Sequence, residues 1–211
     1  MSVWVSVSAS VSNDRWRYMH ESTFAQLADH VAVGQRVLAL APEVDRIAEV
    51  LKSVFRAGGT VFTLGNGGSA SDAQHFTGEL IGHYKRDRRP LPAVTLGSDS
   101  TTMTCIANDY AFADVFSRQV TALAGNRDAV VAFTTSGTSP NVVLALQAAQ
   151  ANGAITILFG GGDGGTALAH ADYALLSPST LTPRIQEAHT LFLHAISESL
   201  DAWAAGEESN A

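Results

Sequence analysis

The sequence is short of cysteine and of long apolar runs, and each shortage excludes a class of protein. Its single cysteine, Cys105, allows no disulfide within the 211 residues and fits a reducing compartment. We therefore expect a cytoplasmic protein in which Cys105 is a small buried residue. No apolar run reaches the roughly 20 residues that span a bilayer. Residues 1–14 alternate valine with serine and lack the basic and apolar regions of a signal peptide.

Basic residues are also scarce. The chain has 13 lysines and arginines against 20 acidic residues, a net charge of -7, so we expect no nucleic-acid partner and no membrane partner. The one basic run, residues 83–89, contains an acid and stops at Pro90, which predicts the solvated end of a helix. Apolar residues, by contrast, make up 46% of the chain, which is ample for the core of one domain.

Apolar periodicity predicts two leading helices, at residues 15–40 and 42–56, and then an alternation of strands and helices. Short apolar runs rich in β-branched residues are typical of strands covered on both faces. These runs are residues 60–64, 93–96, 129–133, 154–159 and 173–176. Helical spacing is found at residues 69–84, 100–107, 112–122, 140–151, 166–170 and 183–203.

Strands separated by helical lengths imply right-handed crossovers and a parallel sheet with helices on both faces. The predicted fold class is α/β: a doubly wound, three-layer αβα sandwich with a parallel sheet of about five strands, plus N-terminal helices. We divide the chain into an extension, the leading helices, an α/β domain that forms one globular unit with those helices, and a tail. These parts are residues 1–14, 15–58, 59–205 and 206–211.

The first candidate site is the stretch 65–79, GNGGSASDAQHFTGE, where a predicted strand runs through a glycine-rich turn into a helix. Glycines let the turn approach a ligand, and the helix N-terminus favours an anion. The stretch lacks both the P-loop lysine and the dinucleotide fingerprint, and a plain tight connection is the alternative. His75 and Glu79 share one face of the helix as a base and a possible metal ligand, although such a pair is usually a surface hydrogen bond.

The second candidate is the loop 134–140, TTSGTSP, which also follows a strand and precedes a helix. Five of its seven residues carry hydroxyl groups, and hydroxyls beside a helix N-terminus suit a phosphate monoester. Capping the helix would need only one of them, and an ordinary N-cap is the alternative. No lysine is present to balance a polyphosphate, so a sugar phosphate fits better than a nucleotide.

Three further segments carry polar residues at informative places. His194, in the last predicted helix, has apolar neighbours, and a buried core histidine is the alternative to a catalytic one. On an ideal helix, Gln186 is separated from His194 by two turns plus about 80°. Gln186 and His194 can therefore serve one site only if the helix start frays or if the two residues face different subunits. Asn108 and Asp109 could bind sugar hydroxyls or cap a helix.

For the glycine run 160–165, a plain connection between a strand and a helix is favoured over a ligand-binding loop.

In order and spacing, these motifs resemble the sugar isomerase (SIS) domain family over residues 44–200, and within it the phosphoheptose isomerases. The resemblance rests on GNGGSASDAQHFTGEL, PAVTL, IANDY, FSRQV, TTSGTSPN and PRIQEAHTLFLH. It implies a homotetramer with active sites between subunits. It also implies reversible conversion of D-sedoheptulose 7-phosphate to D-glycero-D-manno-heptose 7-phosphate through an enediol, the first step towards nucleotide-activated heptose.

The resemblance assigns a role to each motif residue. Glu79 would be the catalytic base and His194 its partner acid/base. One Zn²⁺ per subunit would be held by His75, Glu79, Gln186 and His194. The phosphate would be bound by Thr134, Thr135, Ser136 and Ser139. The sugar would be lined by Asn66, Gly67, Gly68, Ser69, Asn108, Asp109 and Gln186. The chain departs from the family pattern at Thr134 and Thr138, where serine and asparagine are common.

Two other functions remain open. Some relatives with this fold bind the bacterial replication initiator and catalyse no reaction. Such relatives look like proteins without the glutamate and the final histidine that stand here at Glu79 and His194. This chain keeps Glu79 and His194, which favours an enzyme over a binding module. The protein could also isomerise another sugar phosphate, because a loop of hydroxyls holds phosphate without measuring chain length.

Overall fold

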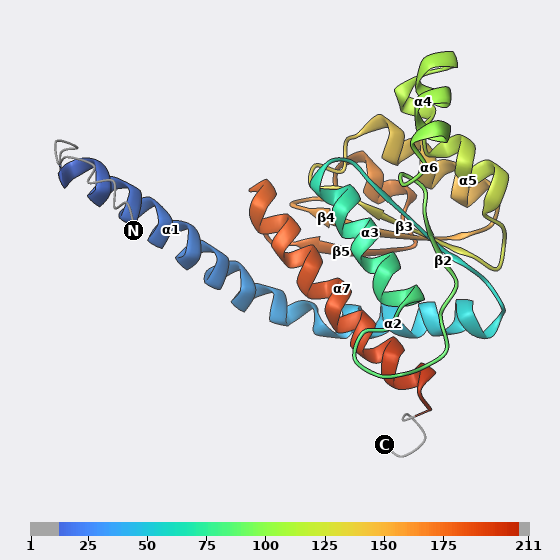
Figure 1. Cartoon of the computed structure of the whole chain (residues 1–211), viewed down its shortest axis with the longest axis horizontal. Coiled ribbons are helices and arrows are strands. Elements are labelled where there is room, and N and C mark those ends of the chain that lie inside the picture. Colours follow the sequence, from blue (N-terminus) through green and yellow to red (C-terminus); the bar gives the residue numbers. More distant parts are fainter. Residues whose placement is uncertain (1–12, 207–211) are drawn as a thin grey trace, which may run out of the picture.

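The computed structural model describes residues 13–206, and its centre is a five-stranded sheet between two layers of helices (Figure 1). The strands lie in the order β2-β1-β3-β4-β5, and every neighbouring pair is parallel. Their bounds are β1 Val61–Gly65, β2 Ala93–Thr95, β3 Ala129–Phe133, β4 Ile155–Gly161 and β5 Tyr173–Ser177. The predicted fold class is confirmed.

Helices cover both faces of this sheet and enclose two separate apolar cores. The first core lies under α2, α3, α7 and the C-terminal part of α1, and the second lies under α4, α5 and α6. The helices of the first face are α1 Asn13–Val37, η1 Leu38–Leu40, α2 Ala41–Arg56, α3 Gly68–Ile81 and α7 Thr182–Ala204. Those of the second face are α4 Ser100–Asp109, η2 Phe112–Asp114, α5 Ser117–Leu123, α6 Pro140–Ala151 and η3 Gly165–His170.

The strands show why their sequences are apolar without alternation. Every residue of β1 and β3 is buried. Side chains along β3 point alternately to the two cores, with Val131 and Phe133 in the first and Val130 and Ala132 in the second. A parallel sheet covered on both faces has no solvent side and therefore no polar positions to alternate with.

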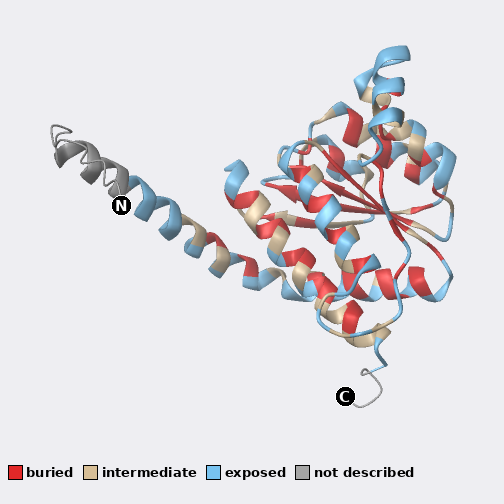
Figure 2. Cartoon of the chain, in the orientation of Figure 1, coloured by how far each residue is buried: buried red, intermediate tan, exposed pale blue. Residues whose placement is uncertain are grey.

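The helix α1 projects away from the sheet, and its described outer part, residues 22–28, is exposed (Figure 2). Three of its apolar side chains are more than half exposed: Phe24 at 74%, Leu27 at 62% and Val31 at 57%. The predicted extension of residues 1–14 overlaps α1 at its last two residues, and its other residues lie outside the described part of the chain. Within the described residues, no helix is both long and apolar enough to cross a membrane.

Four local predictions were wrong. The helix expected over residues 69–84 ends at Ile81, because the chain turns away at Gly82. The basic run that follows is therefore a loop, and the side chain of Arg88 in it is only 1% exposed, because it pairs with Asp201. The helix expected over residues 112–122 is split into η2 and α5. Cys105 is exposed rather than buried, because it lies in α4, where Ile106 is the residue that is buried.

Candidate active site

A cavity of about 250 Å³ lies at the carboxyl edge of the sheet, where ligands bind in open α/β folds. It is next to the starts of three helices: α3, α6 and α7. Its lining combines the glycine-rich turn, the hydroxyl loop and the start of α7: Asn66, Gly68, Ser69, Phe133, Thr134, Thr135, Ser136, Ser139, Thr182 and Gln186. The structure thus brings together nine polar or glycine positions and one phenylalanine from three distant segments.

The helix starts around this cavity are uncapped. Among the described residues, α3, α6 and α7 each begin without a side-chain hydrogen bond to the first turn. The N–H groups of a first turn have no partner inside the helix and carry the positive end of its dipole. Ser139 occupies the cap position of α6 but makes no capping bond, which counts against the N-cap alternative for the hydroxyl loop. Three uncapped helix starts make this cavity suited to an anion.

Two glycines explain how the loops fit together. Gly67 has a φ of 56°, which turns the chain sharply into α3. A Cβ on Gly68 would overlap the side chain of Gln186, so glycine lets α3 and α7 approach closely here. The side-chain amides of Asn66 and Asn141 also exchange two hydrogen bonds, of 2.8 and 2.9 Å, which tie the glycine-rich turn to the start of α6.

The glycine run 160–165 supports the hydroxyl loop. Gly137 has a φ of 65°, and a Cβ there would overlap the carbonyl oxygen of Gly164. Its own carbonyl oxygen accepts hydrogen bonds from the Ala167 amide at 2.8 Å and from the Thr166 hydroxyl at 3.2 Å. The glycine run therefore does not only connect a strand to a helix, because Gly164 packs directly against Gly137 of the hydroxyl loop.

A second cluster lies on the outer side of α3 and α7, which pack side by side. The Nε2 atom of His75 is 3.1 Å from Oε1 of Glu79 and 3.3 Å from Nε2 of His194. One ligand atom from each of the three residues lies within 4.8 Å of the others. The cluster is open to solvent, since the side chains of His75 and Glu79 are 40% and 19% exposed. His194 is therefore at the surface of the core, which excludes the buried alternative.

The environment of His194 favours its neutral form. Burial lowers the pKa of His194 below its ordinary value, and the neighbouring His75 lowers it further, while Glu79 acts in the opposite direction. A neutral imidazole keeps a nitrogen lone pair at neutral pH. His194 can therefore accept a proton or bind a metal there.

These three residues fit a zinc ion. Two imidazole nitrogens and a carboxylate oxygen are ordinary zinc ligands. Zinc–nitrogen bonds of about 2.0–2.1 Å at the tetrahedral angle put two ligand nitrogens about 3.3 Å apart, which matches the 3.3 Å between His75 and His194. A set of three protein ligands also leaves a position for substrate or water.

Gln186 lies with the cavity and not with this cluster. It precedes His194 by eight residues of α7, which is about 12 Å along the helix axis. Gly68 and His75 are separated in the same way by about 10 Å of α3. Because both helices start at the cavity and run parallel, the cavity and the three-residue cluster are the two ends of one strip along α3 and α7.

Asn108 and Asp109 lie elsewhere in the chain. They are exposed at the end of α4, on the opposite face of the sheet, and the Asn108 amide donates to the Asp109 carboxylate at 2.8 Å. Neither lines the cavity, and neither is the cap residue of the following helix, which is Ala111. The structure therefore does not bring them together with the other predicted site residues.

Three residues near the site were not predicted from the sequence. Thr182 lines the cavity, Asn141 braces it through Asn66, and Tyr84 packs against His194. The signal for Thr182 and Asn141 is their position in the first turn of a helix that starts at the carboxyl edge of the sheet. Tyr84 gave no such signal, because its loop was expected to be helical and solvated.

Comparison with known proteins gives the family. Residues 27–161 match the SIS domain. The protein named phosphoheptose isomerase from Geobacter sp. (strain M21) is 43% identical over 184 residues, which cover 87% of this chain and 96% of that one. The phosphoheptose isomerase of Trichlorobacter lovleyi is 45% identical over 83% of this chain and 90% of its own length. The chain belongs to the SIS domain family and, within it, to the phosphoheptose isomerases.

Solved structures of family members have the same fold. Phosphoheptose isomerase from Neisseria gonorrhoeae superposes with a TM-score of 0.83 at 37% identity, covering 87% of this chain and 99% of that one. The enzyme from Francisella tularensis gives a TM-score of 0.78 at 33% identity, covering 91% and 99%. The similarity therefore extends over nearly the whole length of both relatives.

Proposed function

We propose that this phosphoheptose isomerase family member interconverts D-sedoheptulose 7-phosphate and D-glycero-D-manno-heptose 7-phosphate, the first step towards nucleotide-activated heptose. The observation that carries the proposal is the contact of Glu79 with His75 and, through it, His194 on two helices that start at an anion-binding cavity. Relatives that are 43% and 45% identical bear the name of this activity. A carboxylate beside imidazoles is what an aldose–ketose isomerase needs.

In this proposal the phosphate binds in the cavity. The hydroxyls of Thr134, Thr135, Ser136 and Ser139 and the free N–H groups of the helix starts would bond its oxygens. Asn66, Gly67, Gly68, Ser69 and Gln186 would then lie along the sugar. Fixing the phosphate at one end of the strip holds the reacting carbons at the other end, and such positioning lowers the entropic barrier to reaction.

The reaction moves two protons. Glu79 would remove the proton of C1 in the open-chain ketose and return it to C2, with an enediol between the two steps. His194 would take the proton of the O1 hydroxyl and supply one to O2, so that a carbonyl forms at C1 and a hydroxyl at C2. General acid–base catalysis of this kind contributes about 10²–10⁴ in rate.

Zinc is part of the proposal. His75, Glu79 and His194 would hold the ion, and Gln186, the fourth predicted ligand, would reach it only across a subunit boundary, given its separation of about 12 Å from His194 along α7. When bound, Zn²⁺ supplies Lewis-acid stabilisation of the substrate oxygens. Because Glu79 and His194 would each serve both as a zinc ligand and as a proton-transfer group, we expect the site to bind zinc with modest affinity.

The proposal includes a homotetramer with active sites between subunits. The apolar residues exposed on α1, Phe24, Leu27 and Val31, support it, as does Leu191, which is 47% exposed on the same helix as His194. Exposed apolar patches of this kind mark interaction sites. Sedimentation would contradict this part if it showed an active monomer. We place the protein in the cytoplasm, where an exposed free cysteine would stay reduced.

The experiment is a panel of five-, six- and seven-carbon ketose phosphates, each assayed with and without a chelator. We expect turnover to be greatest with sedoheptulose 7-phosphate and to be restored by Zn²⁺ after chelation. Preference for a shorter ketose phosphate would support the second isomerase alternative. Absence of turnover with every sugar would overturn the proposal in favour of a non-catalytic binding module.

A further inference from the structure

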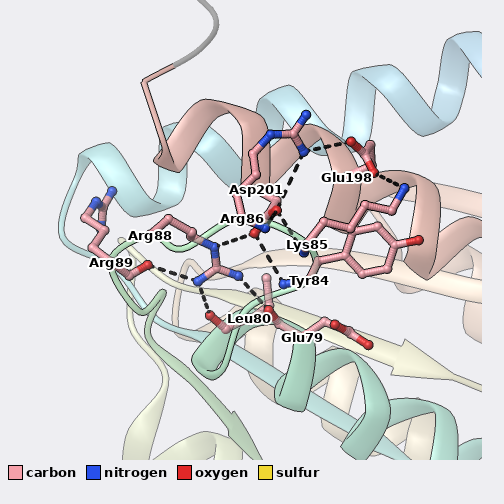
Figure 3. Close-up of polar contacts among 9 residues, drawn as sticks. All are labelled: Glu79, Leu80, Tyr84, Lys85, Arg86, Arg88, Arg89, Glu198 and Asp201. Carbon is pink, nitrogen blue, oxygen red and sulfur yellow. Dashed lines mark hydrogen bonds and ion pairs between the residues drawn. The ribbon is translucent and has the colours of Figure 1, made fainter.

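A buried carboxylate on α7 binds the loop that follows α3 and so connects the two helices of the candidate site. Asp201, on α7, is 0% exposed. It accepts hydrogen bonds from the backbone amides of Tyr84, Lys85 and Arg86 at 3.3, 3.0 and 2.7 Å. It also accepts a bond from Nε of Arg88 at 2.9 Å (Figure 3). Four donors thus fix the loop that follows α3 to α7.

The guanidinium of Arg88 reaches from this carboxylate to the end of α3. One of its terminal nitrogens donates to the carbonyl oxygen of Leu80 at 2.8 Å, and the other donates to that of Glu79 at 2.6 Å (Figure 3). The last carbonyls of a helix have no partner within it and carry the negative end of its dipole. Arg88 therefore holds the very turn of α3 that carries the proposed base.

The same loop touches the proposed partner acid/base. The ring of Tyr84 lies against the imidazole of His194, with centroids 5.6 Å apart and planes inclined by 32°. His75 also contacts that imidazole, with ring centroids 4.9 Å apart and planes inclined by 80°, so the ring of His194 packs against both Tyr84 and His75. The backbone of Tyr84 is fixed in turn by Asp201.

The charge of Asp201 is stable in this setting. Burial alone would raise the pKa of Asp201, but its bonds with the amides of Lys85, Arg86 and Tyr84 and with Arg88 outweigh that effect and lower it. Its bond with Arg88 is a buried ion pair, since both side chains are almost wholly inaccessible, at 0% and 1% exposed. Removing one member of such a pair is costly, because the other is left buried and uncompensated.

We propose that Asp201 is a positioning residue that sets the catalytic geometry, acting on Glu79 through Arg88 and on His194 through Tyr84. The inference rests on the proposed function for the roles of Glu79 and His194. Asp201 follows His194 by seven residues, about 10 Å along α7, so it acts through its neighbours and does not touch the reacting atoms. A misplacement of about 1 Å can cost about a hundredfold in rate.

The test uses Tyr84→Ala and Asp201→Asn in the full-length protein, assayed with the best ketose phosphate of the wild type. We expect kcat to fall about tenfold for Tyr84→Ala and about a hundredfold for Asp201→Asn. KM should stay within about twofold, because the phosphate cavity does not include the loop. Tyr84→Phe keeps the ring and should restore kcat. Glu198→Gln is the matched control, since Glu198 lies on the same helix and pairs with the side chains of Lys85 and Arg86, whereas Asp201 binds the backbone of the loop and Arg88 and makes a longer ion pair of 3.6 Å with Arg86.

A second measurement separates this inference from the proposed function. Zinc binding to the metal-free proteins, measured by competition with a coloured chelator, should weaken about tenfold in Tyr84→Ala and Asp201→Asn and stay unchanged in Glu198→Gln and Tyr84→Phe. Thermal unfolding identifies any variant that is misfolded. If Asp201→Asn does not fold, the kcat and zinc affinity of Tyr84→Ala test the inference. Wild-type kcat and zinc affinity in Tyr84→Ala would overturn the inference. If the wild type is inactive on every sugar, the proposed function is overturned. The inference about Asp201 is then tested by the zinc affinities of the variants alone.

Discussion

The two ends of the candidate site are built in opposite ways. The cavity at the carboxyl edge of the sheet is made of loops, backbone amides and hydroxyls, and glycines determine its shape. The cluster of His75, Glu79 and His194 consists of long side chains on the outer surface of two regular helices. The cavity is fixed by the sheet itself, whereas the geometry of the cluster depends on how α3 and α7 are held together.

In the proposed reaction, the two ends therefore have different roles: the cavity binds the phosphate and the cluster transfers protons. A backbone site of uncapped helix starts binds a group of constant charge and needs little adjustment. A side-chain site can transfer protons and bind metal, but it must be oriented by surrounding contacts. We therefore expect changes at the cavity to act on KM and changes at the cluster or its supports to act on kcat.

The largest effect on the cavity should come from the substrate. Sedoheptulose without its phosphate should show a kcat/KM lower by about 10³-fold, because several hydrogen bonds to a charged group, each worth about 1.5–3 kcal/mol, are lost. Steady-state kinetics on both sugars measure this. Equal kcat/KM for the two sugars would contradict the assignment of the cavity to phosphate.

Next in size is Gly137→Ala. The new Cβ would overlap the carbonyl of Gly164 and impose a positive φ on alanine, so we expect a loss of about 2–4 kcal/mol in the free energy of unfolding. Urea denaturation measures the loss. Gly58→Ala is the matched control, because Gly58 has a φ of 73° and no atom of residues 13–206 beyond its chain neighbours lies within 4 Å of the new Cβ, so it should cost only about 1 kcal/mol.

A smaller effect is expected from Ser139→Ala. The hydroxyl makes no capping bond within the described structure, so its loss should leave the unfolding free energy within about 0.5 kcal/mol. Its predicted bond to the phosphate should appear as a rise of about tenfold in KM with kcat unchanged. A large loss of stability with an unchanged KM would show that Ser139 caps α6.

The smallest effect concerns His194 in the metal-free protein. Because burial and His75 lower its pKa below the ordinary 6.5, its ring should become charged only at a pH below that value. Nuclear magnetic resonance of the ring protons follows this titration. Tyr84→Ala uncovers the ring and should move the midpoint upward, and a midpoint above 6.5 in the wild type would contradict the effect of burial.

The fold and the cavity could be predicted because their signals are local. Each strand is a short run of apolar and β-branched residues, and its end is followed by glycines or hydroxyls, which placed the two loops at one edge of the sheet. The pairing of Gly137 with Gly164 could not be predicted, since it depends on two loops that are separated in sequence by a whole helix and strand.

The supports of the cluster were the part that sequence reasoning missed. Arg88 stands in a run of charges, which is usually solvated, and nothing local shows that Asp201 lies buried beside it. A charged residue that is buried by its partner gives no apolar pattern. The position of Gln186, in contrast, was anticipated as a problem of helix geometry, and the structure places it with the cavity.

The most direct test of the central claim is the turnover of sedoheptulose 7-phosphate by wild type and by Glu79→Gln, with the aldose product identified. The glutamine keeps the size of the side chain and removes the base, so kcat should fall by about 10³-fold, while the unfolding free energy and the affinity for inorganic phosphate stay unchanged. An active wild type with full activity retained in Glu79→Gln would contradict the account.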